Sequence, residues 1–354
     1  MIWSGLPLSP ADALKKYDVD AVLPSTELST HLAPLGKATD GSIARMFAIR
    51  HFPTDCDFPF ESVELETLQD VIDECRVTKD EYEVACIRKA NQITSLAHQA
   101  VMKQVPHARN ERELEAVFLE RSVALGCKEQ AYHGIFGAGE NAATLHYVHN
   151  NQEVQGKSLL LVDAAVEYKC YCADVTRTMP ISGKFSAESK GIYETVLLMQ
   201  KECFAMIKAG VKWEDVHVRA HEVAIEGLLN LGILTGNKKE IFDQGTSVAF
   251  FPHGLGHYLG MDTHDTGGHP NYDDSNKMFK YLRTRGTLPE GSVITVEPGI
   301  YFCRFIVEPY LEDPGHKRFV NEKVLERYWG VGGVRIEGES CSVHLVMALI
   351  MWVG

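Results

Sequence analysis

The sequence predicts an α+β protein in which helices cover the outer side of one curved sheet and two similar halves enclose a cleft. One observation is that two long helix patterns, beginning near Asp80, are followed by several strand-like runs. Another is that the same order of helices and strands recurs from Ser186. Shorter α/β elements precede both halves, so we expect a partial N-terminal α/β domain over residues 1–78, a two-halved domain over 79–337 and an atypical tail over 338–354.

The first half begins with two predicted helices. Apolar residues recur at spacings of three or four between residues 84 and 101, which is typical of a helix with one buried face. A second helix is expected to begin at Asn110, whose side chain can cap it while Glu113 completes a capping box, and to end at Gly126. Strand-like runs follow at residues 132–136, 157–163 and 168–178.

The second half repeats this order. Ser186 is expected to cap a helix that ends near Gly210, and a second helix is expected between Trp213 and Gly232. The strands predicted to follow lie at residues 247–251, 292–297 and 333–337. In the N-terminal region, we expect helices from Pro10 and over 61–76, and strands at 21–23 and 45–49.

Composition restricts the partners and the compartment. The formal net charge of -13 would repel a polyanion and no basic run offsets it, so a nucleic acid is a poor partner. The nine cysteines show no pairing rhythm, and the spacing of Cys170 and Cys172 does not match a CxxC pair, so we expect reduced thiols in a cytoplasmic protein. No signal peptide pattern opens the sequence, and the apolar tail at 343–353 is shorter than the about 20 residues that span a bilayer. We therefore expect no membrane partner.

A stretch with two histidines, residues 250–257, is the most distinctive sequence feature. His253 and His257 are four residues apart, but Gly254 and Gly256 make a helix unfavourable there by about 1 kcal/mol each. Because no glutamate follows His253, the helical HExxH zinc motif is also excluded. We therefore expect a sharp backbone turn that presents imidazoles to a metal or to a polarised carbonyl.

Four apolar runs carry an acid within them or at their end. Asp163 ends one run, Asp174 lies in the next, and a hairpin between them would bring both carboxylates together; either one alone would more often be a satisfied core or turn residue. Glu297 and Glu337 end two later runs. Burying four carboxylates is costly unless cations compensate their charge. Two divalent ions would do so, with His257 as a neutral ligand.

This set of ligands predicts the kind of metal and reaction. Oxygen ligands with a single imidazole suit Mn²⁺ better than a structural zinc, and Co²⁺ or Zn²⁺ are substitutes that such sites accept. A hydroxide shared by two metals is a potent nucleophile at neutral pH. The expected reaction is therefore hydrolysis of a polar acyl or phosphoryl bond.

In chain order, these residues and their flanking motifs closely resemble one family. The motifs are Asp163, Asp174, and residues 251–257, 295–299 and 332–337. They resemble the prolidase and Xaa-Pro aminopeptidase branch of the pita-bread metallopeptidases, and residues 258–265 and 301–302 resemble its eukaryotic prolidase-like subgroup. The resemblance covers residues from about 80 to 337 and implies the pita-bread fold, a curved and mainly antiparallel sheet with helices outside and two pseudo-symmetric halves.

The resemblance also implies roles for individual residues. It implies two Mn²⁺ per subunit, held by Asp163, Asp174, His257, Glu297 and Glu337. Glu297 would also shuttle protons from the attacking water, and His253 and His264 would lie near the substrate carbonyl and its tetrahedral intermediate. His146 would line a proline pocket, and Arg283 and Arg335 would steady a substrate carboxylate, although Arg283 and Arg285 could equally form a solvated basic face.

Three activities are compatible with this resemblance. The first is an Xaa-Pro aminopeptidase that cleaves N-terminal Xaa-Pro bonds with a dimanganese-bridged hydroxide. The second is an Xaa-Pro dipeptidase, or prolidase, and the third is a catalytically silent pita-bread binding module. The expected partners are proline-containing peptides or dipeptides, and a homodimer is one possible assembly.

Both ends of the sequence depart from the family pattern. About half of the family's larger N-terminal domain has no counterpart, and the sequence after Glu337 changes abruptly. We therefore expect truncation at both ends and, as a hypothesis, a gene-model or splicing artefact after Glu337. Sequencing the transcript across this junction tests that hypothesis.

Overall fold

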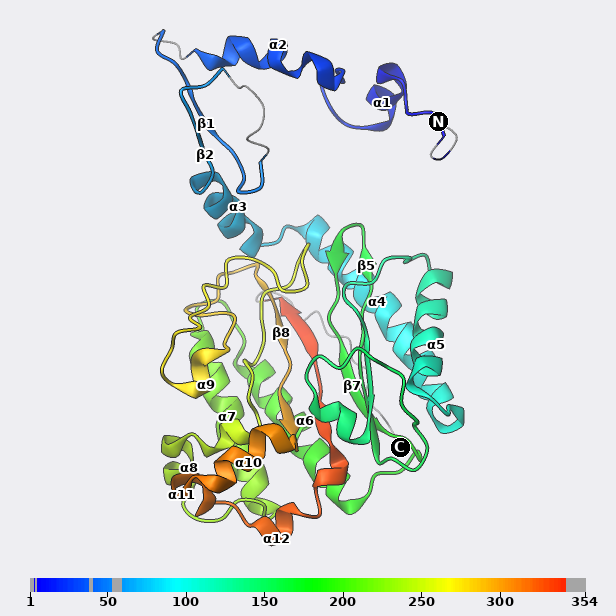
Figure 1. The fold of residues 1–354 in the computed structure, drawn as a ribbon, viewed down its shortest axis with the longest axis vertical. Helices are drawn as coiled ribbons and strands as arrows, with labels where there is room; N and C mark the ends of the chain where they lie inside the picture. Colours follow the sequence, from blue (N-terminus) through cyan, green and yellow to red (C-terminus); the bar gives the residue numbers. More distant parts are fainter. Residues whose placement is uncertain (1–2, 4, 38–40, 53–58, 342–354) are drawn as a thin grey trace. The chain divides into compact units, whose positions relative to one another are not determined.

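The computed structural model describes residues 3, 5–37, 41–52 and 59–341 (Figure 1). The chain divides into two compact units, Met1–Cys75 and Arg76–Gly354. All candidate site residues lie in the second unit.

The first unit consists of short elements. They are α1 (Pro10–Lys16), α2 (Leu28–Leu32), β1 (Arg45–Phe47), β2 (Ser62–Glu64) and the first part of α3 (Thr67–Val77). Strands β1 and β2 pair in parallel. The helix predicted over 61–76 therefore begins only at Thr67, because residues 62–64 pair with β1. Residues 21–23, predicted as a strand, form no regular element.

The second unit begins with the predicted helices α4 (Glu81–Gln104) and α5 (Glu111–Ala124). Asn110 caps α5 as predicted, because its side chain accepts a hydrogen bond from the Arg112 backbone N–H. The capping box is wrong in detail: Glu113 accepts from the backbone N–H of Arg109 instead of that of Asn110. Local sequence therefore determined where both helices begin.

The next strands form an antiparallel sheet in the order β3 (Ile135–Ala138), β4 (Leu159–Asp163) and β7 (Thr176–Pro180). The run predicted as one strand over 168–178 is divided into three. Lys169 and Cys170 have φ of 50° and 66°, and they form the tight turn of a hairpin between β5 (Glu167–Tyr168) and β6 (Tyr171–Cys172). Asp163 lies opposite Thr176, so Asp174 lies near Asp163 in the connection before β7, and not inside a strand.

The second half repeats the order of helices and strands. Its long helices are α6 (Ala187–Met206), capped by Ser186 as predicted, and α7 (Trp213–Asn230). Strand β8 (Val293–Val296) pairs antiparallel with β11 (Gly338–Cys341), and β9 (Gly299–Tyr301) pairs antiparallel with β10 (Gly333–Arg335). The sheet thus continues past Glu337 to Cys341, and the predicted atypical tail from residue 342 onward lies outside the described residues.

One predicted strand of this half is wrong. Residues 246–249 form a 3₁₀ turn, because the backbone N–H groups of Phe250 and Phe251 both bond back to the carbonyl of Ser247. The remaining helices are short: α8 (Lys238–Gln244), α9 (Lys277–Lys280), α10 (Arg304–Glu312), α11 (Pro314–Lys317) and α12 (Glu322–Leu325).

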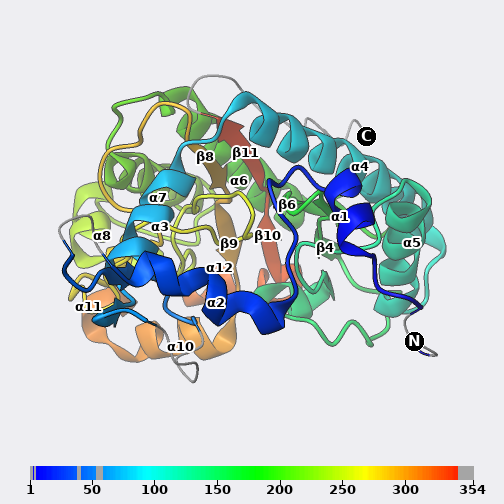
Figure 2. The same ribbon diagram turned by 90° about the horizontal axis from the view of Figure 1, so that it is seen from above.

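The two halves join where β7 lies beside β10 and the residues that follow it. The Arg335 N–H donates to Thr178 Oγ1 at 3.2 Å, and the Glu337 N–H donates to the Thr176 carbonyl at 3.1 Å. Each half has its own apolar core, one beneath α4 and α5 and the other beneath α6 and α7. Figure 2 shows strands β4, β8, β9 and β10 between α4 and α5 on one side and α7 and α8 on the other. The predicted α+β architecture is confirmed.

Two further observations concern the compartment. No helix within the described ranges is long and apolar enough to cross a membrane. The eight cysteines of the described part of the chain are free, and Cys56 lies outside it.

Three histidines buried in this unit predict how its stability depends on pH. His98, His217 and His221 have no exposed surface, and their burial lowers the pKa of the first two to about 4 and that of His221 well below its ordinary value. The unfolded chain protonates these histidines near pH 6.5, whereas the folded chain protonates His98 and His217 only near pH 4. His98 and His217 should therefore each remove about 1.4 kcal/mol of unfolding free energy per pH unit as the pH falls between these values, and the lowered pKa of His221 acts in the same direction.

Urea unfolding of metal-depleted protein between pH 6 and pH 4.5 measures this slope. His217→Gln should make the decline shallower by about 1.4 kcal/mol per pH unit, because one titrating group is removed. The exposed His107→Gln is the matched control and should keep the wild-type slope. Equal slopes in His217→Gln and the wild type would contradict the prediction.

Candidate metal centre and active site

The double-histidine stretch, residues 250–257, follows η5 (Thr246–Ala249) and is not helical, as predicted. Its glycines allow two close backbone approaches. A Cβ at Gly254 would lie 2.7 Å from the Tyr281 carbonyl oxygen, and a Cβ at Gly256 would lie 2.0 Å from that of Thr295. A larger residue at Gly256 would push this stretch away from β8, and one at Gly254 would push it away from residues 281–282. The glycines therefore place the two histidines beside the strand that leads to Glu297.

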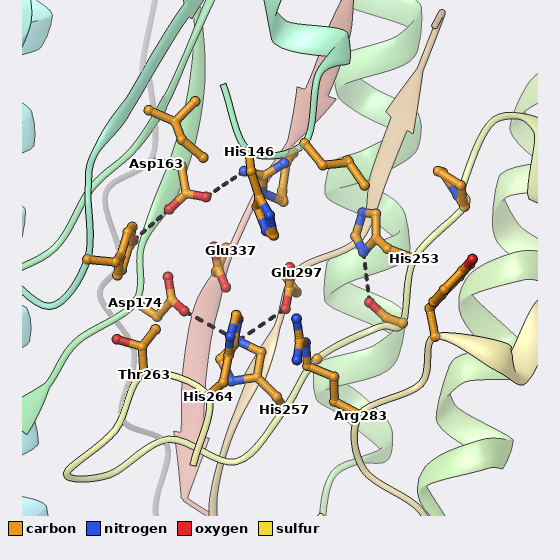
Figure 3. A pocket seen from close by; sticks show the side chains of 18 of the residues that line it. His146, Asp163, Asp174, His253, His257, Thr263, His264, Arg283, Glu297 and Glu337 are labelled. Atoms are coloured by element: carbon orange, nitrogen blue, oxygen red, sulfur yellow. Dashed lines mark hydrogen bonds and ion pairs between the residues drawn. The ribbon is translucent and has the colours of Figure 1, made fainter. Parts of the chain in front are cut away.

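Acids from both halves meet at His257. Asp174, His257 and Glu337 are buried, and each offers a ligand atom that lies within 4.8 Å of the others. His257 Nε2 is 3.3 Å from Asp174 Oδ2 and 3.3 Å from Glu297 Oε1. Figure 3 shows Asp174, Glu297 and Glu337 around this imidazole. The structure thus brings four of the five predicted ligands together, although they lie up to 163 positions apart in the chain.

The hydrogen bonds of His257 test whether this group fits a metal. Its Nδ1 lies 2.9 Å from the Tyr258 carbonyl, which can only accept, so Nδ1 carries the proton and Nε2 presents a lone pair. Burial lowers the pKa of His257 to about 4, so the ring is neutral at pH 7. A lone pair that faces two carboxylate oxygens is unfavourable unless a cation lies among them. The residues therefore fit a divalent metal ion.

The carboxyl groups lead to the same conclusion. Burial raises the pKa of Asp174, Glu297 and Glu337 well above their ordinary values, and the neighbouring carboxylates raise each of them further. Without a cation, these groups resist ionisation at neutral pH. Divalent ions would compensate the charge, and a set of oxygens with one imidazole suits Mn²⁺ and similar ions.

Asp163, the fifth predicted ligand, lies at the end of β4 in the wall of the same cavity. Its Oδ1 accepts from the Tyr132 hydroxyl at 2.6 Å and its Oδ2 accepts from Arg335 at 2.5 Å. Arg335 also donates to Tyr301 Oη at 2.9 Å and to Thr176 Oγ1 at 3.1 Å. The buried guanidinium of Arg335 thus donates hydrogen bonds to three side chains and holds Asp163 in place. The predicted contact of Arg335 with a substrate carboxylate stays a prediction.

The two predicted catalytic histidines differ in their surroundings. His253 Nδ1 donates to the Gly254 carbonyl at 2.8 Å, so Nε2 accepts from the Tyr301 hydroxyl at 2.9 Å. His264 lies edge-on to His257 with ring centroids 4.4 Å apart, and its ring makes no hydrogen bond within the described part of the chain. Burial lowers the pKa of both to about 3. His264 can therefore offer a neutral N–H to a ligand.

A cavity of about 1010 Å³ connects these groups with the predicted substrate residues. His146, His253, His264 and Arg283 all line it. Figure 3 shows His146 and Arg283 reaching the region around His257 and Glu297. Arg285, from the same basic run, is turned into the protein, where it donates to Asp274 at 3.1 Å and to the Phe279 carbonyl at 2.5 Å. The run is therefore not a uniform solvated face.

Residues 85–340 match metallopeptidase family M24. The chain belongs to this family. A probable Xaa-Pro aminopeptidase of Botryotinia fuckeliana is 59% identical over 95% of this chain and 73% of its own length. One of Sclerotinia sclerotiorum is 58% identical over 95% of this chain and 61% of its own length, so this chain spans less than two thirds of that relative.

Solved structures of bacterial aminopeptidase P have the same fold. A histidine-to-alanine variant of Escherichia coli aminopeptidase P superposes with a TM-score of 0.80 at 28% identity, covering 99% of this chain and 77% of that one. The Escherichia coli enzyme with the inhibitor Pro-Leu gives a TM-score of 0.78 at 29% identity, with the same shares covered. The predicted pita-bread fold and the predicted class, a metal-dependent peptidase related to the Xaa-Pro aminopeptidases, are confirmed.

In this M24 site, a buried ion-pair cluster anchors the loop that carries His264. Asp265 accepts from Arg76 at 2.5 Å and from Lys79 at 2.8 Å, and the side chains of Lys79 and Asp265 are each only 1% exposed. The Asp265 N–H also donates, at 2.9 Å, to the Tyr258 carbonyl that fixes the tautomer of His257. Asp265 thus anchors the loop of His264 through its carboxylate and helps to orient His257 through its backbone N–H. Sequence reasoning named Asp265 only as part of a motif and missed both cations, because no local pattern marks them.

A second buried acid fixes the loop that carries His146. Glu111 has no exposed surface, and its oxygens accept four hydrogen bonds of 2.7–2.9 Å. The donors are the Ala138 N–H, Asn141 Nδ2, the Tyr147 hydroxyl and the Gln152 N–H. The helix pattern identified Glu111 only as a residue in the first turn of α5, so its contacts became visible only in the structure.

Two more residues bond directly to the predicted metal ligands. Thr176 Oγ1 donates to Glu337 Oε2 at 2.5 Å. Glu339 Oε1 accepts from the Asp174 backbone N–H at 2.6 Å, and burial raises the pKa of Glu339 to about 7. Sequence analysis missed Glu339 because it lies beyond the last recognised motif.

Proposed function

We propose that this chain is an Xaa-Pro aminopeptidase that uses two divalent metal ions, Mn²⁺ in the first instance. The observation that carries this proposal is the lone pair of His257 Nε2 facing two carboxylate oxygens at 3.3 Å inside a cavity of about 1010 Å³. The names of the fungal relatives and the Pro-Leu ligand of the bacterial structure support the choice of substrate. The proposed ligands are Asp163, Asp174, His257, Glu297 and Glu337.

When bound, the two ions would supply a nucleophile from water at neutral pH and polarise the scissile carbonyl. Glu297 is the proposed proton carrier, and its side chain is 18% exposed against 7% for Asp174. It can therefore contact water and the leaving nitrogen while it remains beside His257. Arg335 and Tyr132 hold Asp163 so that this ligand cannot turn away from the site.

His264 is proposed to donate its free ring N–H to the substrate carbonyl oxygen as negative charge develops there. A neutral imidazole is the right donor, because the lowered pKa of His264 excludes a charged ring at pH 7. His146 and Arg283 would position the proline and the chain that follows it. His253, which accepts from Tyr301, would form the wall beside them.

Peptide hydrolysis by the purified chain tests this proposal. With added Mn²⁺, Ala-Pro-Ala should release alanine, Ala-Ala-Ala should not, and a chelator should abolish the reaction. Faster cleavage of Ala-Pro than of Ala-Pro-Ala would identify the dipeptidase alternative instead. If the folded chain shows no metal binding and no turnover, the silent binding module is supported and the enzyme is refuted. The predicted cytoplasmic location and homodimer stay predictions.

A further inference from the structure

The cavity extends beyond the metal ligands to a cationic wall. Lys277, Lys280 and Arg283 follow one another at intervals of three, on α9 and the turn after it, and all three line the cavity. The cavity volume of about 1010 Å³ lies at the upper end of the range of roughly 300–1,000 Å³ for small-molecule sites. The cavity therefore has room for a peptide longer than a dipeptide.

Within the described part of the chain, no acidic side chain pairs with either of the two lysines of this wall. Lys280 has no ion-pair partner within the described ranges, and Lys277 Nζ lies 5.4 Å from the centroid of the Tyr310 ring. Two acids near this wall do not line the cavity and pair with arginines instead: Asp274 with Arg285 and Glu308 with Arg304. The lysines are thus available to an anionic ligand.

Aromatic rings lie in the same cavity as the two lysines. Tyr272, Tyr281 and Tyr310 also line the cavity, and the first two are exposed by 48% and 55%. Exposed tyrosines provide rigid apolar area with a polar tip, which suits an extended peptide. This wall therefore combines contact area with positive charge, on a chain whose formal net charge is -13.

We propose that Lys277 and Lys280 form a subsite for the substrate residues that follow the proline, and that this subsite favours negatively charged residues. This inference rests on the proposed function. The direction of the peptide follows from electrostatics. The N-terminal ammonium of a substrate is repelled by the lysines, whereas acidic side chains and the C-terminal carboxylate are attracted. The subsite therefore takes the C-terminal part of the substrate and selects peptides with acidic residues after Xaa-Pro.

The test is the ratio of kcat/KM for Ala-Pro-Glu-Glu to kcat/KM for Ala-Pro-Ala-Ala. In the wild type, we expect a ratio above one, with each lysine contributing about 2- to 5-fold as a partly exposed ion pair does. Lys277→Met and Lys280→Met should lower the ratio singly, and the double variant should bring it to about one, mainly through KM. Lys190→Met on α6, 63% exposed, is the matched control and should keep the wild-type ratio. A wild-type ratio of one or less, or an unchanged ratio in the double variant, overturns the proposal.

Calorimetric binding of the product-like peptides Pro-Glu-Glu and Pro-Lys-Lys separates this inference from the proposed function. Binding needs no turnover, so a preference for Pro-Glu-Glu that the double variant loses supports the subsite even if nothing is cleaved. Cleavage without any charge preference would leave the proposed function intact and refute the subsite. Raising the salt concentration should weaken the preference, because exposed charges are screened beyond about 10 Å at 0.1 M salt.

Discussion

Asp174→Asn is expected to lower turnover of an Xaa-Pro peptide by at least about a thousandfold, because it removes a charged metal ligand and keeps the shape of the side chain. The metal-free variant should be as stable as the wild type or more stable. The pKa of Asp174 is raised by burial first and then by Asp163 and Glu297, so its ionisation costs folding free energy at pH 7. The asparagine removes this cost.

Thermal unfolding with and without Mn²⁺ separates these two effects. Added metal should raise the melting temperature of the wild type, and this rise should be much smaller in Asp174→Asn. Asp243→Asn on α8 is the matched control, because the Asp243 side chain is 55% exposed and, among the described residues, forms an ion pair only with Lys239. A near-wild-type rate in Asp174→Asn would show that the two-metal assignment is wrong.

Lys79→Met is expected to lower the free energy of unfolding by about 3 kcal/mol, because it removes one partner of a buried ion pair. Arg76 remains as a partner of Asp265, which keeps the loss at the lower end of the range for such pairs. The rate should also fall, since Asp265 anchors both His264 and the carbonyl that orients His257. Chemical denaturation and steady-state kinetics measure the two losses.

The double variant Lys79→Met/Asp265→Asn distinguishes charge from packing. It removes both buried charges, so it should recover much of the stability that Lys79→Met loses. Lys15→Met is the control, because Lys15 pairs with Asp12 at the surface with its side chain 78% exposed. If the double variant is as unstable as Lys79→Met alone, an unpaired Asp265 is not the cause of the loss.

The amino-acid sequence by itself determined the features that depend on near neighbours. Asn110 and Ser186 cap their helices because a side chain reaches backbone N–H groups one turn away. The strand predicted at 247–251 was wrong for a reason that is also local. The backbone N–H groups of Phe250 and Phe251 bond back to the Ser247 carbonyl, so this apolar run forms a turn. The proposed metal ligands were also named from the sequence, because an acid at the end of an apolar run needs compensation wherever that run lies.

Only the tertiary structure decided which side chains serve these ligands. Arg335 holds Asp163 across 172 positions, Lys79 holds Asp265 across 186, and Glu339 supports Asp174 across 165. No periodicity connects such distant residues, because their contact arises only when the two halves pack together. The double-histidine stretch shows both contributions. Its two glycines show from the sequence alone that no helix forms there. The structure adds the reason why only glycine fits: the backbone of Tyr281 and Thr295 comes too close for a Cβ, and this close approach fixes where His257 presents its lone pair.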